Sequence, residues 1–299
     1  MQRIALSFII AALIVTPARA AKLRVVAATT DLASIVREVA GDRVEVESIA
    51  SGYQNPHAVD AKPSFVIKLA RADAMVRVGL GLDQWADSLS ENARNPRILR
   101  GGAGYIDAAV GVPVLERPSG VDRSMGDLHA FGNPHYWLDP ENAKIVARNI
   151  ADRLAQLDPG DGSAFQQGAA DFSKRIDAAL KGWMAKAKPL QGLKVISYHS
   201  SWAYFAHRFG LDVVGFIEPK PGISPSGAHL NDLISLMQRD SVRVIIKEPY
   251  FSRQGPDKLA AATGAKVVEM PPSVGGAPGV DDYFKLIDYD LDQLLAAVK

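Results

Sequence analysis

The sequence predicts an α/β protein made of two lobes, because short apolar runs alternate twice with stretches of helical pattern. The first alternation begins at Leu23 and the second at Gly192, and a long helical stretch lies between them. Strands that alternate with helices form parallel sheets, so each lobe is expected to hold a parallel-type sheet flanked by helices. The expected boundaries are 21–160 for the first lobe, 161–188 for a connecting helix and 189–299 for the second lobe.

Composition already excludes several classes of protein. The chain has 299 residues, no cysteine, 34 lysines and arginines and 33 aspartates and glutamates, which give a formal net charge of +1. At about 100–200 residues per domain, this length suits two domains. Without cysteine there is no disulfide framework, no thiolate zinc site and no cysteine nucleophile, and we expect no lipid anchor at a lipobox cysteine. The near-zero net charge argues against nucleic acid or an anionic membrane as a partner.

The first twenty residues are expected to be a signal peptide and not part of the fold. Arg3 supplies a positive start, an apolar run covers residues 4–15, and Ala18-Arg19-Ala20 matches the A-x-A cleavage pattern. The apolar run is shorter than the roughly 20 residues that cross a bilayer. We expect cleavage after Ala20 and export, to the periplasm if the organism has an outer membrane.

The elements of the first lobe follow from short local patterns. Leu23–Ala28 is apolar enough for a buried strand, and Thr30-Asp31 can cap the helix that continues to Ala40, because their side-chain oxygens accept amide protons of a first turn. Residues 114–132 are rich in Gly, Pro, Ser and Asp, which predicts a surface loop. The further elements expected here are strands at Val44–Ile49 and Ala74–Val78 and helices at Pro63–Ala72 and Leu82–Ala93.

Two helices and a second alternation follow. Apolar residues recur at helical spacing through Pro140–Leu157, Asp158-Pro159-Gly160 interrupts the pattern, and a second helical stretch covers about Ser163–Lys186. Helical segments then separate four apolar runs, which again favours a parallel sheet. The strands expected in the second lobe are Gly192–Ser197, Val213–Ile217, Val242–Ile246 and Ala265–Glu269.

Two of the six histidines share a local sequence. Asn55-Pro56-His57 follows the strand at Val44–Ile49, and Asn133-Pro134-His135 precedes the helix at Pro140–Leu157. The residue before a proline is biased away from helix, so each histidine is presented from a stiffened loop. Imidazole is the commonest metal ligand, and a stiff loop loses little entropy on coordination. A lone loop histidine is usually an ordinary solvated residue, but the repeated N-P-H setting favours metal ligands.

A third candidate ligand is His199, just past the predicted strand Gly192–Ser197. Ligands of α/β proteins gather beyond the carboxyl ends of strands. The alternative is a histidine whose ring nitrogens are satisfied by nearby backbone groups. His207 is expected to be exposed, and His229 to cap a helix or lie on the surface. His129 falls in the 114–132 loop and, as a single histidine, is expected at most to capture metal transiently.

Four segments together resemble the metal-binding solute-binding proteins of ABC transporters, the cluster A-I family that serves zinc and manganese uptake. Asn133–Pro140 (NPHYWLDP) is similar to the family's D-P-H-x-W-L-D-P, and Asn55-Pro56-His57 followed by Pro63-Ser64 resembles its D-P-H-x-x-x-P-x-P-S-D. Tyr198–Phe205 resembles its H-x-A-x-x-Y-F, and Val244–Ser252 resembles its F-x-E-x-x-F-S. The matches occur in order and span essentially the whole mature chain.

The resemblance implies two α/β lobes joined by one long rigid helix, near Ser163–Lys186, with metal held in the cleft between the lobes. It implies His57 and His135 as ligands from the first lobe and His199 as a ligand from the second. Family members with histidine at the third position tend to be zinc proteins, and imidazole suits zinc whereas Mn²⁺ favours oxygen donors. The expected cargo is therefore Zn²⁺, with Mn²⁺ less favoured.

The fourth ligand stays open at this point. Pro271 stands where the family has a ligating aspartate, and proline has no side-chain donor atom. Glu269 can reach in from a strand end, Glu248 can ligate directly, or water can fill the position. Glu248 can also act indirectly, by holding a ligating imidazole in orientation. The asparagines of the two N-P-H segments replace family aspartates, and the loss of two negative charges should weaken attraction for a divalent cation.

The predicted function is a periplasmic carrier, and not an enzyme, that captures Zn²⁺ and delivers it to an ABC permease in the inner membrane. We expect a monomer, with a periplasmic metallochaperone as a further candidate partner. The alternative is a zinc hydrolase in which three histidines and an open position activate water, with Glu248 as general base. A second alternative is an adhesin-like binding module in which the N-P-H segments are incidental.

Overall fold

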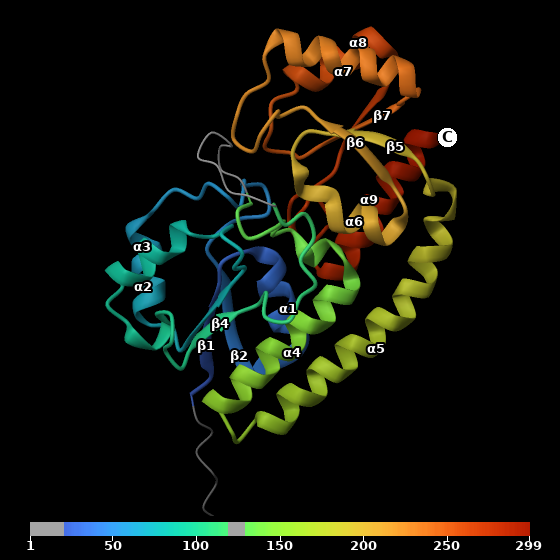
Figure 1. Cartoon of the computed structure of the whole chain (residues 1–299). Coiled ribbons are helices and arrows are strands. Elements are labelled where there is room, and N and C mark those ends of the chain that lie inside the picture. Colours follow the sequence, from blue (N-terminus) through green and yellow to red (C-terminus); the bar gives the residue numbers. More distant parts are fainter. Residues whose placement is uncertain (1–20, 119–128) are drawn as a thin grey trace, which may run out of the picture.

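The protein contains two four-stranded sheets with the same topology, joined through two long helices (Figure 1). In this computed structural model the described residues are 21–118 and 129–299, so the expected signal peptide lies outside them. The strand orders are β2-β1-β3-β4 and β6-β5-β7-β8, and all neighbouring strands are parallel. The predicted α/β class with two parallel sheets is confirmed. Within the described ranges, no helix combines the length and the apolar character that crossing a membrane requires.

The first lobe is built outward from β1, which pairs with β2 on one side and β3 on the other. Thr29 caps α1 by accepting a hydrogen bond from the Leu32 amide at 3.5 Å, and Pro63 opens α2, where a missing N–H is tolerated. The sequence does not predict β4, because three residues are too few to show periodicity. The elements are β1 (Leu23–Ala27), α1 (Thr30–Ala40), β2 (Val44–Ser48), α2 (Pro63–Ala70), β3 (Ala74–Arg77), α3 (Trp85–Asn92) and β4 (Tyr105–Asp107).

The second lobe repeats this arrangement around β5, and its last helix begins beside the first lobe and runs back along the second lobe (Figure 1). Gly210 and Gly264 end α6 and α8 in the left-handed region, where glycine carries no Cβ penalty. The elements are β5 (Lys194–Ser197), α6 (Ala203–Phe209), β6 (Asp212–Phe216), α7 (Gly227–Asp240), β7 (Val244–Lys247), α8 (Gln254–Thr263), β8 (Lys266–Glu269) and α9 (Tyr283–Val298).

Two antiparallel helices carry the chain from one lobe to the other. The first is α4 (Pro140–Leu157), whose cap Asp139 accepts a hydrogen bond from the Glu141 amide at 2.9 Å. The second is α5 (Gly162–Lys186), a 25-residue helix that is about 37 Å long at 1.5 Å per residue. It packs on α4, α1 and α9 and so runs alongside both lobes. The predicted long connecting helix corresponds to α5.

A hydrophobic core runs through both lobes and is closed by the segment before α9, and each lobe has a further core of its own. The core includes residues of both sheets, such as Val25 in β1 and Val195 in β5. The indole of Trp137 donates to the Pro272 carbonyl at 2.8 Å, and the Val274 amide donates to Asp31 Oδ1 at 2.8 Å. These bonds fix the lobes against each other on the side of the molecule where α1 lies.

Candidate metal centre

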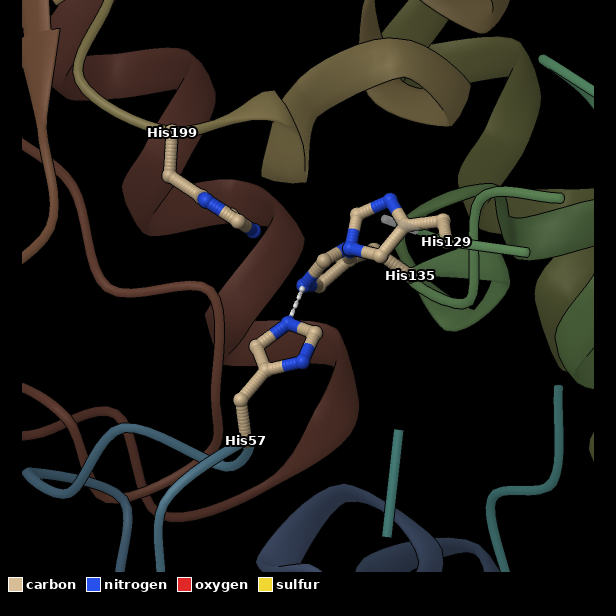
Figure 2. Close-up of side chains that lie close together, drawn as sticks. All are labelled: His57, His129, His135 and His199. Carbon is tan, nitrogen blue, oxygen red and sulfur yellow. Dashed lines mark hydrogen bonds between the residues drawn. The ribbon is translucent and has the colours of Figure 1, made fainter. Parts of the chain in front are cut away.

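Four histidines meet between the lobes. Each offers one ring nitrogen such that all four atoms lie within 4.8 Å of one another (Figure 2). Three of them, His57, His135 and His199, are the ligands that the sequence suggests. The fourth is His129, which lies in the predicted 114–132 loop and is expected from the sequence at most to capture metal transiently. Two lie in buried positions and two are partly buried, so the group is shielded from bulk water.

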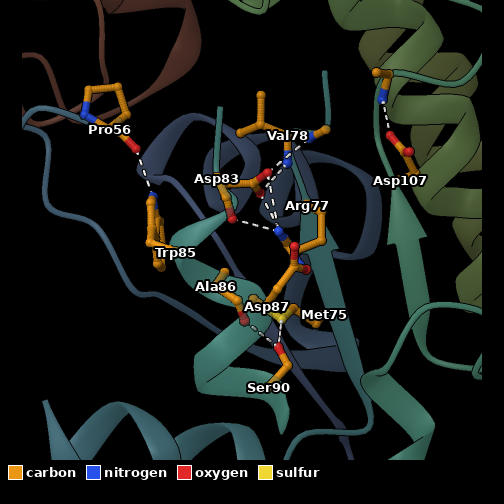
Figure 3. Close-up of polar contacts among 12 residues, drawn as sticks. Pro56, Met75, Arg77, Val78, Asp83, Trp85, Ala86, Asp87, Ser90 and Asp107 are labelled. Atoms are coloured by element: carbon orange, nitrogen blue, oxygen red, sulfur yellow. Dashed lines mark hydrogen bonds and ion pairs between the residues drawn. The ribbon is translucent and has the colours of Figure 1, made fainter. Parts of the chain in front are cut away.

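His57 is held by its own loop and by an indole from α3. Its backbone amide donates to Asn55 Oδ1 at 3.0 Å, which closes the turn that the Asn-Pro pair begins. Trp85 Nε1 donates to the Pro56 carbonyl at 2.9 Å (Figure 3). Because Trp85 is the first residue of α3, the position of His57 depends on how that helix starts.

A buried ion pair sets the start of α3. Arg77 Nε donates to Asp83 Oδ2 at 2.9 Å, and the same oxygen accepts from the Val78 amide at 2.7 Å (Figure 3). Between them the chain makes a tight turn in which Leu80 has φ +51°, flanked by two glycines with positive φ. That turn occupies the first residues of the predicted Leu82–Ala93 helix, and so α3 begins only at Trp85.

His135 is fully buried, and its orientation is fixed by Asn133. Asn133 Oδ1 lies 3.0 Å from both the backbone nitrogen and Nδ1 of His135. An amide oxygen only accepts, so Nδ1 carries the proton and Nε2 keeps its lone pair as an acceptor. Nε2 points into the group and lies 3.0 Å from His57 Nε2 (Figure 2).

His199 is oriented by a carboxylate that the sequence analysis misses. Its Nδ1 lies 2.8 Å from Glu218 Oε2, and both side chains are buried. Carboxylate–histidine pairs of this kind fix the tautomer and raise the basicity of a ligating nitrogen. His199 Nε2 is then left buried without a hydrogen-bond partner. Glu218 could have been suspected, because it directly follows the predicted strand Val213–Ile217 at the carboxyl end of the sheet.

His129 reaches the group because the chain turns back on itself just after it. The Gly132 amide donates to the His129 carbonyl at 2.8 Å, and Gly132 has φ +98°, which favours glycine. A Cβ at Gly132 would lie 2.2 Å from Val114 Cγ1, so a larger residue would not fit this turn. His129 Nε2, like that of His199, is buried without a partner. Two orphaned imidazole nitrogens in one group are what a metal ion would satisfy.

Burial keeps the imidazoles neutral, which is the form that binds metal. Burial, and secondarily the neighbouring imidazoles, lower the pKa values of His57 and His135 well below 6.5. The same causes lower the pKa of His129 to about 3. At neutral pH these three rings are therefore uncharged, and a cation meets no positive charge on them.

The two candidate glutamates lie outside the histidine group. Glu248 Oε1 accepts hydrogen bonds from Ser201 Oγ at 2.7 Å and from Trp202 Nε1 at 3.0 Å. It therefore holds the turn that follows His199, and its burial raises its pKa to about 7. Glu269 is bound by the buried Lys247 ammonium at 3.0 Å. Neither carboxylate belongs to the described group of possible metal-binding side chains.

The space beside the histidines is smaller than the usual site for an organic ligand. A cavity of about 170 Å³ opens there, lined by His57, His129, Trp85 and the turn at Leu80. Pockets for organic ligands usually measure about 300–1,000 Å³. Two α/β lobes that bring four imidazoles together between them define a solute-binding protein whose solute is a metal ion.

Comparison with known proteins leads to the same class and gives the family. The chain belongs to the family of the zinc-uptake complex component A, periplasmic, whose model matches residues 25–297. The manganese ABC transporter substrate-binding lipoprotein PsaA of Streptococcus anginosus is 24% identical over 91% of this chain and 88% of its own length. The high-affinity zinc uptake system protein ZnuA of Brucella abortus is 28% identical over 46% of this chain and 41% of its own.

Solved structures agree with this assignment. A crystal structure of ZnuA matches with a TM-score of 0.79 and 27% identity, covering 93% of this chain and 100% of that one. The binding protein FpvC of Pseudomonas aeruginosa in complex with Mn²⁺ matches with a TM-score of 0.80 and 25% identity, covering 93% and 99%. The protein is thus a metal-binding substrate-binding component of an ABC transporter, an extracytoplasmic and non-enzymatic role. The hydrolase alternative is set aside on this ground.

Proposed function

We propose that this protein captures Zn²⁺ with His57, His129, His135 and His199 and delivers it to the permease of an ABC importer. The observation that carries the proposal is the convergence of four imidazole nitrogens within 4.8 Å. Zinc in proteins is typically four-coordinate and takes nitrogen ligands readily. The family and its relatives provide for both zinc and manganese, so the choice of metal rests on this donor set.

The donor set favours zinc over manganese. Mn²⁺ suits carboxylate, carbonyl and water oxygens, and it stands at the weak end of the divalent affinity order. Glu269 is bound by Lys247, and Glu248 binds Ser201 through Oε1, while its Oε2 is buried without a partner but does not belong to the histidine group. We further propose that residues 1–20 direct export to the periplasm, where capture takes place before delivery.

The experiment is a titration of the metal-free mature chain with Zn²⁺ and, separately, Mn²⁺, followed by calorimetry and native mass spectrometry. We expect about one tightly bound Zn²⁺ and much weaker binding of Mn²⁺. His135→Ala should lose most of the Zn²⁺ affinity, because it removes a fully buried ligand. His207→Ala is the matched control, since that histidine is exposed on α6 outside the group. Unchanged Zn²⁺ affinity in His135→Ala, or tighter binding of Mn²⁺, would refute the proposal.

A further inference from the structure

We propose that Asn133 is a positioning residue for metal binding: its side-chain amide ties His135 to the backbone beside His199 and so couples the two lobes at the site. The inference rests on the proposed function, because it concerns how the same histidines are held. Asn133 is fully buried, and both ends of its amide are used.

The oxygen of the amide serves the first lobe. Asn133 Oδ1 lies 3.0 Å from the His135 backbone nitrogen and 3.0 Å from His135 Nδ1. It therefore fixes both the turn of the chain and the tautomer of the ring. A ring that rotated, or that moved its proton to Nε2, would no longer present a lone pair to the metal.

The nitrogen of the amide serves the second lobe. Asn133 Nδ2 donates to the Ser200 carbonyl at 2.7 Å and to Glu116 Oε2 at 2.8 Å. Ser200 directly follows His199, so one side chain bonds to a ligand of the first lobe and to the residue next to a ligand of the second. The main chain of Asn133 reinforces the link, because its carbonyl accepts from the Tyr204 hydroxyl of α6 at 2.8 Å.

Only an amide meets these demands. An aspartate at this position would keep the acceptor for His135 but would lose both N–H donors. Its second oxygen would face the Ser200 carbonyl and the Glu116 carboxylate, which are acceptors too. The new carboxylate would be buried, and it would repel the Ser200 carbonyl and the carboxylate of the more exposed Glu116, so the lobes would be pushed apart where the histidines meet.

The chain contains a control for the added charge. Asn55 stands two residues before His57 as Asn133 stands before His135, and its Oδ1 accepts from the His57 amide at 3.0 Å. Among the described residues, Asn55 Nδ2 has no hydrogen-bond partner, and the side chain is only partly buried. Asn55→Asp therefore adds the same negative charge beside the site without breaking a link between the lobes.

The chain also contains a control for the loss of a buried amide. Asn95 is buried, its Oδ1 accepts from the Arg97 amide at 3.2 Å, and its Nδ2 donates to the carbonyls of Leu69 and Ala72 at 2.9 and 2.8 Å. All of these partners lie in the first lobe and outside the histidine group. Asn95→Asp should lower the thermal stability of the protein while leaving the metal-binding geometry intact.

The test compares Asn133→Asp, Asn55→Asp and Asn95→Asp in the full-length mature protein, with Zn²⁺ affinity and the rate of Zn²⁺ release to a chelator as readouts. Loss of a group that orients a ligand typically costs about 10–100-fold in metal affinity, and we expect this for Asn133→Asp, mainly through faster release. Asn95→Asp should stay within about threefold of the unsubstituted protein, and Asn55→Asp should bind Zn²⁺ at least as tightly as that protein does, because it keeps the acceptor for His57 and adds a charge that attracts the cation. Adding Glu116→Gln to Asn133→Asp should recover part of the loss, because it removes the carboxylate that the new aspartate faces.

The outcomes separate the two proposals. If the unsubstituted protein binds no Zn²⁺, the proposed function is refuted, and this inference with it. If the unsubstituted protein binds Zn²⁺ tightly and Asn133→Asp binds and releases it as Asn55→Asp does, the positioning role of Asn133 alone is refuted. A loss in Asn95→Asp equal to that in Asn133→Asp would assign the effect to general destabilisation and would also refute it.

Discussion

Replacing His129 by alanine tests the part of the site that the sequence does not predict. The substitution removes one of four imidazoles and leaves the nitrogens of His57, His135 and His199 in place. It also removes a side chain that is only partly buried, so the change should affect the fold little. The Zn²⁺ affinity then reports what the fourth nitrogen contributes.

The size of the effect follows from the number of ligands. Apparent binding free energies of four-ligand structural zinc sites are about 10–16 kcal/mol at neutral pH, or roughly 2.5–4 kcal/mol for each ligand. Because about 1.4 kcal/mol corresponds to tenfold in affinity, losing one imidazole should raise Kd by about two to three orders of magnitude. The lower end applies if water takes the vacant position.

The assay is competition with a chromophoric zinc chelator of known affinity, at pH 7 and fixed ionic strength. The informative comparison is Glu269→Gln, because Glu269 is the alternative fourth ligand and its carboxylate is bound by Lys247. We expect His129→Ala to lose affinity and Glu269→Gln to keep it. The opposite pattern, with His129→Ala within about fivefold of the unsubstituted protein, would refute a four-imidazole site.

Three further predictions concern charge and pH. Glu218→Gln should weaken Zn²⁺ binding by about 10–100-fold, because it removes the charge that orients and polarises His199, and an unchanged chelator titration would contradict this role. Burial lowers the pKa values of His57 and His135, so below about pH 6.5 the unfolded chain binds more protons than the native one. The metal-free protein should therefore lose stability as pH falls through and below that value. Urea unfolding between about pH 7.5 and 4.5 measures this loss, and a free energy of unfolding that does not vary with pH would count against neutral, buried rings. Burial raises the pKa of Asp31 from 3.8 to about 7, which has the opposite sign: this group's contribution is fully present below about pH 4 and is lost as pH rises through about 7. Asp31→Asn keeps the acceptor for the Val274 amide. The free energy of unfolding of this variant, relative to that of the unsubstituted protein, should therefore rise as pH increases from about 4 to about 7. A difference in unfolding free energy that does not vary with pH would contradict the reasoning.

The fold was predictable wherever local patterns were long. The predicted Pro140–Leu157 helix coincides with α4, because an Asp-Pro start and an apolar stripe mark it in the sequence. The prediction that α3 would begin at Leu82 is wrong, because the Arg77–Asp83 ion pair and the turn at Leu80 delay it. That delay depends on a contact between side chains, which periodicity does not record.

The site was predictable only for residues with a local signal. His57 and His135 follow Asn-Pro, and His199 follows a strand, so each could be suspected from its neighbours. His129 enters the group through a turn at Gly132 that packs against Val114, a contact between distant parts of a loop. Glu218 and His199 are brought together because β6 lies beside β5 in the sheet, which only the strand order reveals.

The shared core also determines how the chain folds. The buried face of α9, including Tyr283, Ile287 and Leu291, packs in the same core as Ile35 and Val36 of α1. The sixteen residues of α9 therefore complete a core to which the first lobe contributes, although the two are far apart in the sequence. Each lobe also has a core of its own, on the sheet face that carries α2 and α3 in the first lobe and α7 and α8 in the second. The core that the lobes share should nevertheless couple them, so we expect the protein to unfold in one cooperative transition.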